Sequence, residues 1–450
     1  MHLTRALKSI PIAALTLGAA LGCNDFLSGG DLSNDPNNPT QATNSQLFVG
    51  TQSYLWSFME SDAARITGIF AQQFEGSGLG YLAIQTYDID ESTTNTLHQS
   101  IYLTGGLVDL RKLEDGARAV GDSILLGTAQ VEEAMLIGTA ADIFGDIVYS
   151  NAFGGPNPAP DPQLEVYDQV QALLDDAIEN LAATGPTNFG PGPADLNYGG
   201  DPEQWTKLAY TLKARFYLHT AEVRPTAYAS ALEAAQNGMT SSADDYKAVF
   251  SGGAGEENFY ENFVKKRGGY LLPNQQFVEL LEDRGDPRLA EYFNEDVTNI
   301  SDERLDPGYD QPIVTANENL LIWAEALQRT GAGGPALAKL NEARALAGLG
   351  SLSGLSGNAL LGEILTEKYI ALYQTIEPFN DYKRTCFPNL ASNVEGQIIP
   401  ARLFYDVSEV QTNTSLKKAN EQPRRNANDP ANAVDDVTGQ ACTGQLGGGI

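Results

Sequence analysis

The stretch LLIWAEALQRTGAGGPALAKLNEARALAGL, residues 320–349, indicates the fold class of this chain. Apolar residues recur at spacings of three and four on both sides of a break at Gly331-Ala332-Gly333-Gly334, which is the pattern of amphipathic helices. Pro335 suits the first turn of the second helix, where a missing N–H costs nothing. The stretch therefore predicts a helix hairpin between Glu318 and Gly348.

The same periodicity extends through most of the chain. In 166–181 the apolar residues follow one helix face after the start signal Asp161-Pro162. Another helix begins after Asp201, its predicted N-cap, and its apolar face carries Trp205 and Phe216. Further helices are expected at 44–62, 94–119, 128–144 and 359–376, and loops at 145–162, 183–202 and 251–273.

Strand signals are few and short, so the expected fold is mainly α, with helix hairpins and long loops. The hairpin at 318–348 is close in size to a tetratricopeptide unit, which has about 34 residues. No second linker comparable to the one before residue 44 divides the chain. We therefore expect one large helical domain over 44–450.

The N-terminus has the pattern of a secretory signal peptide. Arg5 and Lys8 precede an apolar run, and Gly22-Cys23 is followed at once by polar residues. A cysteine directly after small residues is where bacterial lipoprotein signals are cut and acylated. We expect removal of residues 1–22, lipidation of Cys23, and an anchor with a flexible Gly-, Asn- and Pro-rich tether over 23–43. The alternative is an ordinary cleaved signal that leaves Cys23 as a secreted cysteine.

The charge of the chain is strongly acidic, with 28 Lys and Arg against 58 Asp and Glu and a formal net charge of −30. Nucleic acid is not an expected partner, because phosphate binding draws on clustered Lys and Arg. The excess favours neutral or cationic ligands over polyanions, although its only role could be surface solubility. Beyond Cys23 no apolar stretch approaches the roughly 20 residues of a spanning helix. We therefore expect the membrane to be reached through the N-terminal lipid only.

No catalytic, metal or cofactor motif stands out. After the signal the chain has only His98 and His219, and neither has the spacing of a metal ligand set. The glycines of EGSGLGY (75–81) do not follow a suitable strand, and we interpret them as a flexible loop. Because carboxylates are abundant, a hydrolase with two catalytic carboxylates is the alternative, but nothing selects a pair. We expect a protein that is not an enzyme.

Aromatic side chains give the best indication of a binding site. Sugars and peptides stack on Trp and Tyr while neighbouring amides and carboxylates take the polar groups. The segment 70–90 offers such residues in loop-like sequence, and Trp56 is a further candidate. The candidate ligand-binding residues are Gln72, Gln73, Phe74, Tyr81, Tyr87 and Trp56. The alternative is that these aromatics complete the helical core, as we expect for Trp205 and Trp323.

Three cysteines are present, and lipidation of Cys23 leaves Cys386 and Cys442 as a pair in an oxidising compartment. We expect a disulfide that ties the C-terminal tail to the body. Two unrelated thiols are the alternative.

Several segments, taken in order, resemble one known family. They are CNDFL (23–27), DIFGDIVYSNAF (142–153), VYDQVQALLDDAIENL (166–181), WTKLAYTLKARFYLHTA (205–221), FVELLEDRGDPRLAEYF (277–293), the hairpin 320–349, EKYIALYQTIEPFNDYKRTCFPNL (367–390) and IIPARLFYDVSE (398–409). This ordered set is similar to the SusD/RagB family of nutrient-binding lipoproteins. Asp406 stands where the most similar branch often has Pro.

The resemblance implies a SusD-like helical fold with tetratricopeptide-like hairpins, lipid-anchored at the cell surface of the outer membrane. It also implies a SusC-like TonB-dependent transporter as partner, over which the lipoprotein acts as a lid. Ligands in the family are mainly oligosaccharides, with peptides in some members. The family's carbohydrate-stacking residues have no matching motif here. A secreted carboxylate-dependent hydrolase and a tetratricopeptide-type protein-binding scaffold remain the alternatives.

Overall fold

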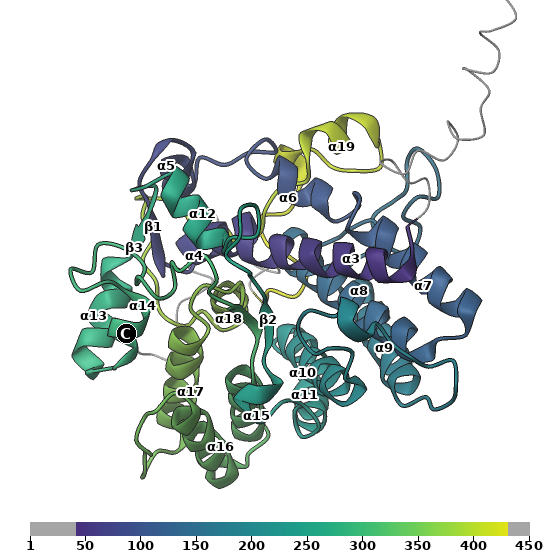
Figure 1. Ribbon diagram of the computed structural model, residues 1–450. Coiled ribbons are helices and arrows are strands. Elements are labelled where there is room, and N and C mark those ends of the chain that lie inside the picture. Colours follow the sequence, from purple (N-terminus) through teal and green to yellow (C-terminus); the bar gives the residue numbers. More distant parts are fainter. Residues whose placement is uncertain (1–41, 431–450) are drawn as a thin grey trace, which may run out of the picture. The chain divides into compact units, whose positions relative to one another are not determined.

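The computed structural model describes residues 42–430, and most of this part is helical (Figure 1). This confirms the predicted mainly α fold. The helices are α3 (Asn44–Phe58), α4 (Ala64–Phe70), α5 (Leu79–Gln85), α6 (Asn95–Ser100), α7 (Leu107–Val120), α8 (Ser123–Phe144), α9 (Gln163–Leu181), α10 (Pro202–Thr220), α11 (Ala227–Ala235), α12 (Phe259–Lys266), α13 (Gln275–Arg284), α14 (Arg288–Tyr292), α15 (Ala316–Arg329), α16 (Gly333–Leu346), α17 (Gly357–Ala371), α18 (Glu377–Thr385) and α19 (Val407–Thr412). The strands are β1 (Phe74–Gly76), β2 (Tyr246–Ala248), β3 (Leu271–Pro273) and β4 (Gln311–Val314).

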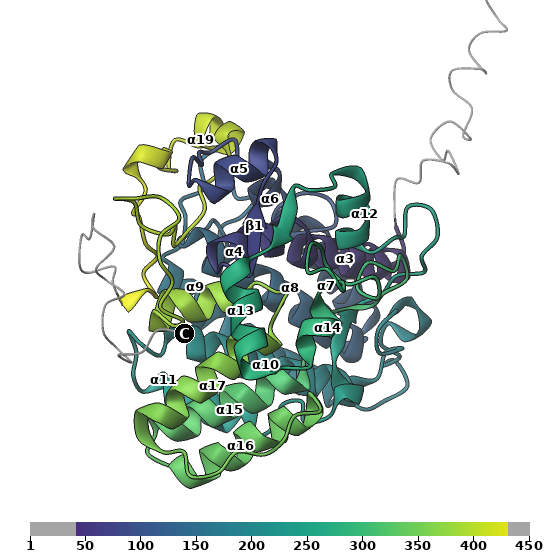
Figure 2. The same ribbon diagram turned by 90° about the vertical axis from the view of Figure 1, so that its left-hand side faces the viewer.

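The predicted hairpin is the pair α15 and α16, which pack side by side with α17 in both views (Figures 1 and 2). The Thr315 hydroxyl accepts a hydrogen bond from the Glu318 N–H at 3.1 Å and so caps the start of α15. Pro335 lies in the first turn of α16, as expected. The boundaries at Ala316 and Leu346 lie within two residues of those predicted.

Helices α8, α9, α10 and α11 continue this packing, each in contact with the next. Asp201 caps α10 as predicted, since its carboxylate accepts a hydrogen bond from the Glu203 N–H at 2.9 Å. Trp205 is 0% exposed, which confirms its core position. Helix α8 is buried along nearly its whole length, and Gly138 gives the Phe216 ring of α10 room to approach its backbone. The centre of this helical body is therefore tightly packed.

Two short antiparallel ladders join distant parts of the chain. Strand β1 pairs with β3, with Phe74 opposite Pro273, and β2 pairs with β4, with Tyr246 opposite Val314. The first ladder fixes the predicted binding segment against a loop that follows it by about two hundred residues.

Three local predictions are wrong. The segment 94–119 is not one helix, because Gly105 (φ 91°) and Gly106 lie in a break between α6 and α7. The expected loop 251–273 contains α12 and β3, whose ordering comes from contacts with the distant segment 74–81. The supposed loop 75–81 forms the end of β1 and the start of α5 for the same reason.

Some predictions fall outside the described residues 42–430. They are the signal peptide, the lipid on Cys23, most of the tether and the half of the disulfide at Cys442, and all of them stay predictions. Within the described range, none of the helices combines the length and apolar character needed to cross a membrane.

Candidate ligand-binding surface

The structure places three of the predicted ligand residues in the interior. The Gln73 amide nitrogen donates to the Tyr369 carbonyl at 2.6 Å, and the Gln72 amide nitrogen donates to the Ala391 carbonyl at 2.5 Å. The ring of Phe74, 1% exposed, lies 5.1 Å from that of Tyr373, centroid to centroid. These side chains join β1 to the helical body, which favours the alternative that they complete the core.

Trp56 has a similar environment. It is 3% exposed, and its indole N–H donates to the Tyr246 hydroxyl at 3.1 Å. A buried indole with a satisfied N–H is typical of a structural residue. A ligand role for Trp56, Gln72, Gln73 or Phe74 stays a prediction.

Tyr81 lies nearer the surface, in a cluster drawn from α4, α5, α12 and the π-helix Met59–Ala63. Its hydroxyl accepts a hydrogen bond from Arg65 Nε at 2.8 Å and donates to the Asp62 carboxylate at 3.2 Å. Its ring lies 4.9 Å from that of Phe263, and the Arg65 guanidinium lies 4.4 Å from the Phe263 ring centroid. Burial raises the pKa of the Tyr81 hydroxyl, so it stays protonated and able to donate. The Asp62 side chain is 49% exposed and gives this cluster an edge in solvent.

Tyr87 lies at the edge of a pocket of about 440 Å³, within the roughly 300–1,000 Å³ typical of ligand sites. Its hydroxyl accepts a hydrogen bond from the Asn393 N–H at 3.1 Å, and its ring meets Phe70 edge to face. We call this cavity the Tyr87 pocket. Its lining residues are Tyr87, Ile89, Gln397, Ile398, Pro400, Ala401, Arg402, Phe404, Ala419, Asn420, Gln422, Pro423 and Arg424.

The walls of the Tyr87 pocket combine apolar surface with polar groups. Phe404 is half-buried, whereas Gln397, Asn420 and Arg424 are exposed and therefore accessible to a ligand. Arg402 is buried and already donates to the Phe144 carbonyl at 2.6 Å and to the Gln422 side chain at 2.9 Å. An aromatic wall with exposed amides suits a sugar, which has apolar ring faces and hydroxyls at its edge.

A second hollow, of about 640 Å³, adjoins the same stretches of chain. Its residues include Glu91, Val410, Leu416 and Lys418, on and around α19. Helix α19 lies beside α6 in both views (Figures 1 and 2). Asp406 caps α19 by accepting a hydrogen bond from the Glu409 N–H at 2.8 Å.

Sequence reasoning included Tyr87 but missed Phe404, Asn420 and Arg424. These residues come from the far end of the described chain, more than three hundred residues after Tyr87. Pro400 and Pro423 were a local indication of loops in this region, because they lie in a stretch with little helical periodicity.

His98 and His219 are both buried, and neither lines the Tyr87 pocket. Burial lowers the pKa of His98 to about 4, and its ring packs 4.9 Å from that of Phe144. His219 lies between Asp142 and Glu377, at 2.8 Å from a carboxylate oxygen of each. Among residues 42–430 no group of three His, Cys, Asp or Glu side chains is placed to hold a metal ion.

Cys386 lies buried at the C-terminal end of α18. Its predicted partner, Cys442, is outside the described residues, so the pairing stays a prediction.

Comparison with known proteins gives one family match. The SusD-like family described as "Starch-binding associating with outer membrane" matches residues 36–332. No curated protein sequence matches the chain.

Solved structures share the fold. A SusD/RagB family protein from Bacteroides thetaiotaomicron superposes with a TM-score of 0.68 at 20% identity, covering 90% of this chain and 100% of that chain. A chitin-binding protein gives 0.68 at 22% identity, covering 82% and 94%. A chitin-binding SusD homologue from Flavobacterium johnsoniae gives 0.67 at 17% identity, covering 85% and 97%.

Proposed function

Because the chain belongs to the SusD-like family, we propose that it is a carbohydrate-binding protein that captures nutrient molecules at the outer membrane and is not an enzyme. The observation that carries the proposal is the Tyr87 pocket, whose volume, aromatic wall and exposed amides suit a sugar. The chitin-binding proteins among the structural neighbours support carbohydrate as the ligand class. We propose oligosaccharides first and peptides second.

Capture is reversible binding without chemistry. One sugar ring packs its apolar face on Phe404, and its hydroxyls exchange water for the side chains of Gln397 and Asn420. The Arg424 guanidinium is positively charged, and its N–H groups donate hydrogen bonds to ring or hydroxyl oxygens. A neighbouring sugar unit can extend toward the hollow at α19, where Glu91 and Lys418 present further polar groups.

The finer parts of the proposal rest on the sequence and on the family. We propose that Cys23 carries lipid and that the protein works with a SusC-like TonB-dependent transporter, which supplies the energy for uptake. Replacement of Cys23 by serine is expected to release the protein from membranes. Continued partition of Cys23→Ser into detergent would contradict lipidation.

A pull-down from detergent-solubilised outer membranes tests the transporter. Recovery of a β-barrel protein with the wild type supports the partnership, and its repeated absence contradicts it. The same pull-down from a strain that carries Cys23→Ser is the matched control, because the variant is expected to be released from membranes.

The binding site is tested by calorimetry of the mature protein with starch, chitin and peptide fragments. Phe404→Ala is expected to lower the affinity for the bound carbohydrate by about tenfold, equal to about 1.4 kcal/mol. Phe189→Ala is the control, because Phe189 is 79% exposed and does not line the pocket. Equal affinities in wild type and Phe404→Ala would show that the ligand binds elsewhere.

The same panel separates the alternatives. Selective binding of peptides would redirect the proposal to that ligand class. Release of reducing sugar or cleaved peptide, abolished by changing one Asp or Glu, would show a hydrolase instead.

A further inference from the structure

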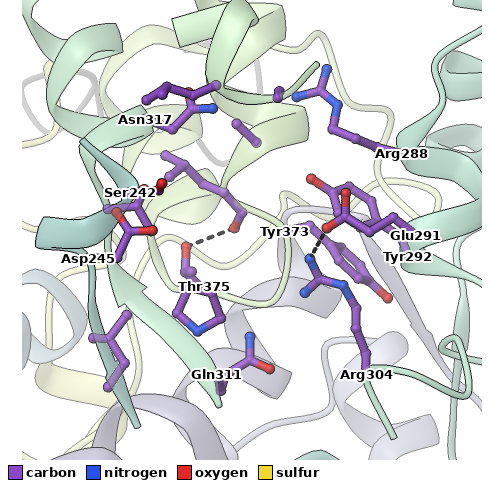
Figure 3. Close-up of a pocket in the computed structure, with 17 residues that line it drawn as sticks. Ser242, Asp245, Arg288, Glu291, Tyr292, Arg304, Gln311, Asn317, Tyr373 and Thr375 are labelled. Carbon is purple, nitrogen blue, oxygen red and sulfur yellow. Dashed lines mark hydrogen bonds and ion pairs between the residues drawn. The ribbon is translucent and has the colours of Figure 1, made fainter. Parts of the chain in front are cut away.

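A third cavity, of about 190 Å³, lies in a different part of the molecule from the Tyr87 pocket and shares no lining residue with it (Figure 3). Its walls come from α14, β4, the start of α15, the end of α16 and the turn after α17. Exposed Ser242, Glu291 and Leu346 line it, so it opens to solvent. We call it the Gln311 cavity.

Buried polar atoms in the Gln311 cavity lack partners. Gln311 is 1% exposed, and within the described residues neither its amide nitrogen nor its amide oxygen has a hydrogen-bond partner. The buried amide oxygen of Asn317 is also without a partner in that range. Figure 3 shows Gln311 and Asn317 on opposite sides of the cavity. Leaving a buried amide unsatisfied costs free energy, so such groups in a native protein point to a missing partner.

The cations around the Gln311 cavity are already paired. Arg288 donates to the Asp286 carboxylate at 2.6 Å, with a second ion pair to Glu367 at 2.5 Å. Arg304 donates to Glu291 at 2.6 Å and to Gln374 at 2.7 Å. The side of the cavity formed by these arginines is therefore close to neutral and does not select an anion.

Within the described residues, the unpaired buried side-chain atoms of the cavity include donors, namely the Gln311 amide nitrogen, Arg304 Nε and the Tyr373 hydroxyl, as well as acceptors. Besides the two amide oxygens of Gln311 and Asn317, the cavity has the carboxylate of Asp245, one oxygen of which accepts a hydrogen bond from the Ala316 N–H at 2.8 Å. Burial raises the pKa of Asp245 to about 6, and a cationic or hydroxyl-donating ligand would stabilise its ionised form. The cavity therefore matches a molecule with several hydroxyl groups, because a hydroxyl can both donate and accept hydrogen bonds.

Size limits the ligand further. The cavity far exceeds the 10–15 Å³ or so that one water requires, yet it falls below the roughly 300 Å³ at which pockets accept drug-sized ligands. The rings and chains of Tyr292, Ile313 and Leu372 supply apolar walls for one small ring.

We propose that the Gln311 cavity is a second, separate binding site that takes one hydroxyl-rich molecule the size of a single sugar ring, either a neutral monosaccharide or an amino sugar. The Gln311 amide donates to and accepts from the ligand, and Asn317 and Asp245 accept from its hydroxyl or ammonium groups. The inference stands independently of the proposed function, since none of these residues lines the Tyr87 pocket.

Calorimetry and thermal melting of the mature protein with glucosamine, glucose and N-acetylglucosamine test this site. At least one of the three is expected to bind the wild type and to raise its melting temperature. Gln311→Leu is expected to weaken that binding at least tenfold, without lowering the melting temperature of the free protein, because leucine removes the unsatisfied amide at similar volume. Phe404→Ala is expected to leave monosaccharide binding unchanged, which distinguishes this site from the Tyr87 pocket.

Further variants separate the two ligand chemistries. If Asp245→Asn weakens glucosamine more than glucose, the site recognises the ammonium group; equal losses indicate hydroxyl recognition, and both outcomes support the site. Should Gln311→Leu fail to fold, Asn317→Ala is expected to give the same loss of binding. Absence of binding by all three sugars, or equal affinity in wild type and the cavity variants, would overturn the proposal and leave a hydrated cavity only.

Discussion

Charged side chains are buried and paired in the helical body, whereas a charged side chain is exposed at the surface around the Tyr87 pocket. In the body, Arg384 is 1% exposed and donates to Glu325 at 2.6 and 2.7 Å and to Asp381 at 2.6 and 3.0 Å. At the pocket, Arg424 extends into solvent. The first arrangement holds helices together, whereas the second leaves a charge available to a ligand.

A second buried network strengthens the contrast. Arg215 donates to both oxygens of Glu318 at 2.6 Å and lies 3.5 Å from Glu377, which in turn contacts His219. These groups come from α10, α15 and α18 and lie at the meeting point of the three helices. Buried charges tolerate few alternatives, because an unpaired one is costly. The residues that stabilise the helical body are therefore different from those of the proposed ligand site.

The largest effect is expected from Arg384→Met. The variant leaves Glu325 and Asp381 buried with only part of their compensation, and breaking such a pair typically costs about 3–5 kcal/mol of the free energy of unfolding. Urea denaturation measures this loss. Arg224→Met is the matched control, because the pair of Arg224 with Asp168 is exposed by 36% and 61%, and its loss should cost at most about 1 kcal/mol. Equal losses in the two variants would remove the contrast.

The His219 network predicts a pH dependence. Burial by itself lowers the pKa of His219, but the charges of Asp142 and Glu377 outweigh it and raise the pKa to about 9. The unfolded value is about 6.5, so the contribution is complete below that pH and is lost as pH rises toward 9. The expected loss is about 3 kcal/mol, at about 1.4 kcal/mol per pKa unit.

Denaturation at pH 6, 7, 8 and 9 checks this dependence on pH. His219→Gln should flatten the curve relative to wild type, whatever its absolute stability. A wild-type curve parallel to that of the variant would contradict the raised pKa.

Variants of Tyr81 test whether its cluster belongs to the helical body or to a ligand-binding surface. Its contacts with Arg65, Asp62 and Phe263 predict that Tyr81→Ala lowers the free energy of unfolding by about 2–3 kcal/mol. Tyr81→Phe keeps the ring and should lose only about 1 kcal/mol. Melting temperature and carbohydrate affinity are measured together. Unchanged stability with weakened affinity would instead assign Tyr81 to the ligand surface.

The smallest effect on stability is expected at the Tyr87 pocket. Asn420→Ala removes an exposed amide, so the free energy of unfolding should change by no more than about 0.5 kcal/mol. Carbohydrate affinity should nevertheless fall several-fold, as seen by calorimetry. A destabilised Asn420→Ala would show that this loop is part of the structural body.

Local sequence patterns predicted most of the long helices but few of the residues at the candidate site. The hairpin of α15 and α16 follows from apolar spacing and a glycine break within thirty residues. At the missed break between α6 and α7, Gly105 fits against the distant Tyr54, where an added Cβ would lie 2.6 Å from the ring. The pair Gly105-Gly106 was itself a local turn signal that the prediction did not use.

The binding residues depend even more on tertiary contacts. Phe74 and Phe404 look equally apolar in sequence, yet Phe74 is buried against Tyr373 and Phe404 lines a pocket. Which face of an aromatic meets solvent is decided by segments that approach from elsewhere in the chain. Within the segment 70–90, Tyr87 and Ile89 line the Tyr87 pocket, and their role in ligand binding stays a prediction.

The order in which the pocket residues occur along the chain has a consequence for synthesis. Tyr87 and Ile89 emerge early from the ribosome, whereas Phe404, Asn420 and Arg424 emerge more than three hundred residues later. A growing chain that has not reached residue 397 has no Tyr87 pocket, even if its early helices have already formed. If the Tyr87 pocket is the capture site, as proposed, that site is therefore completed only at the end of synthesis.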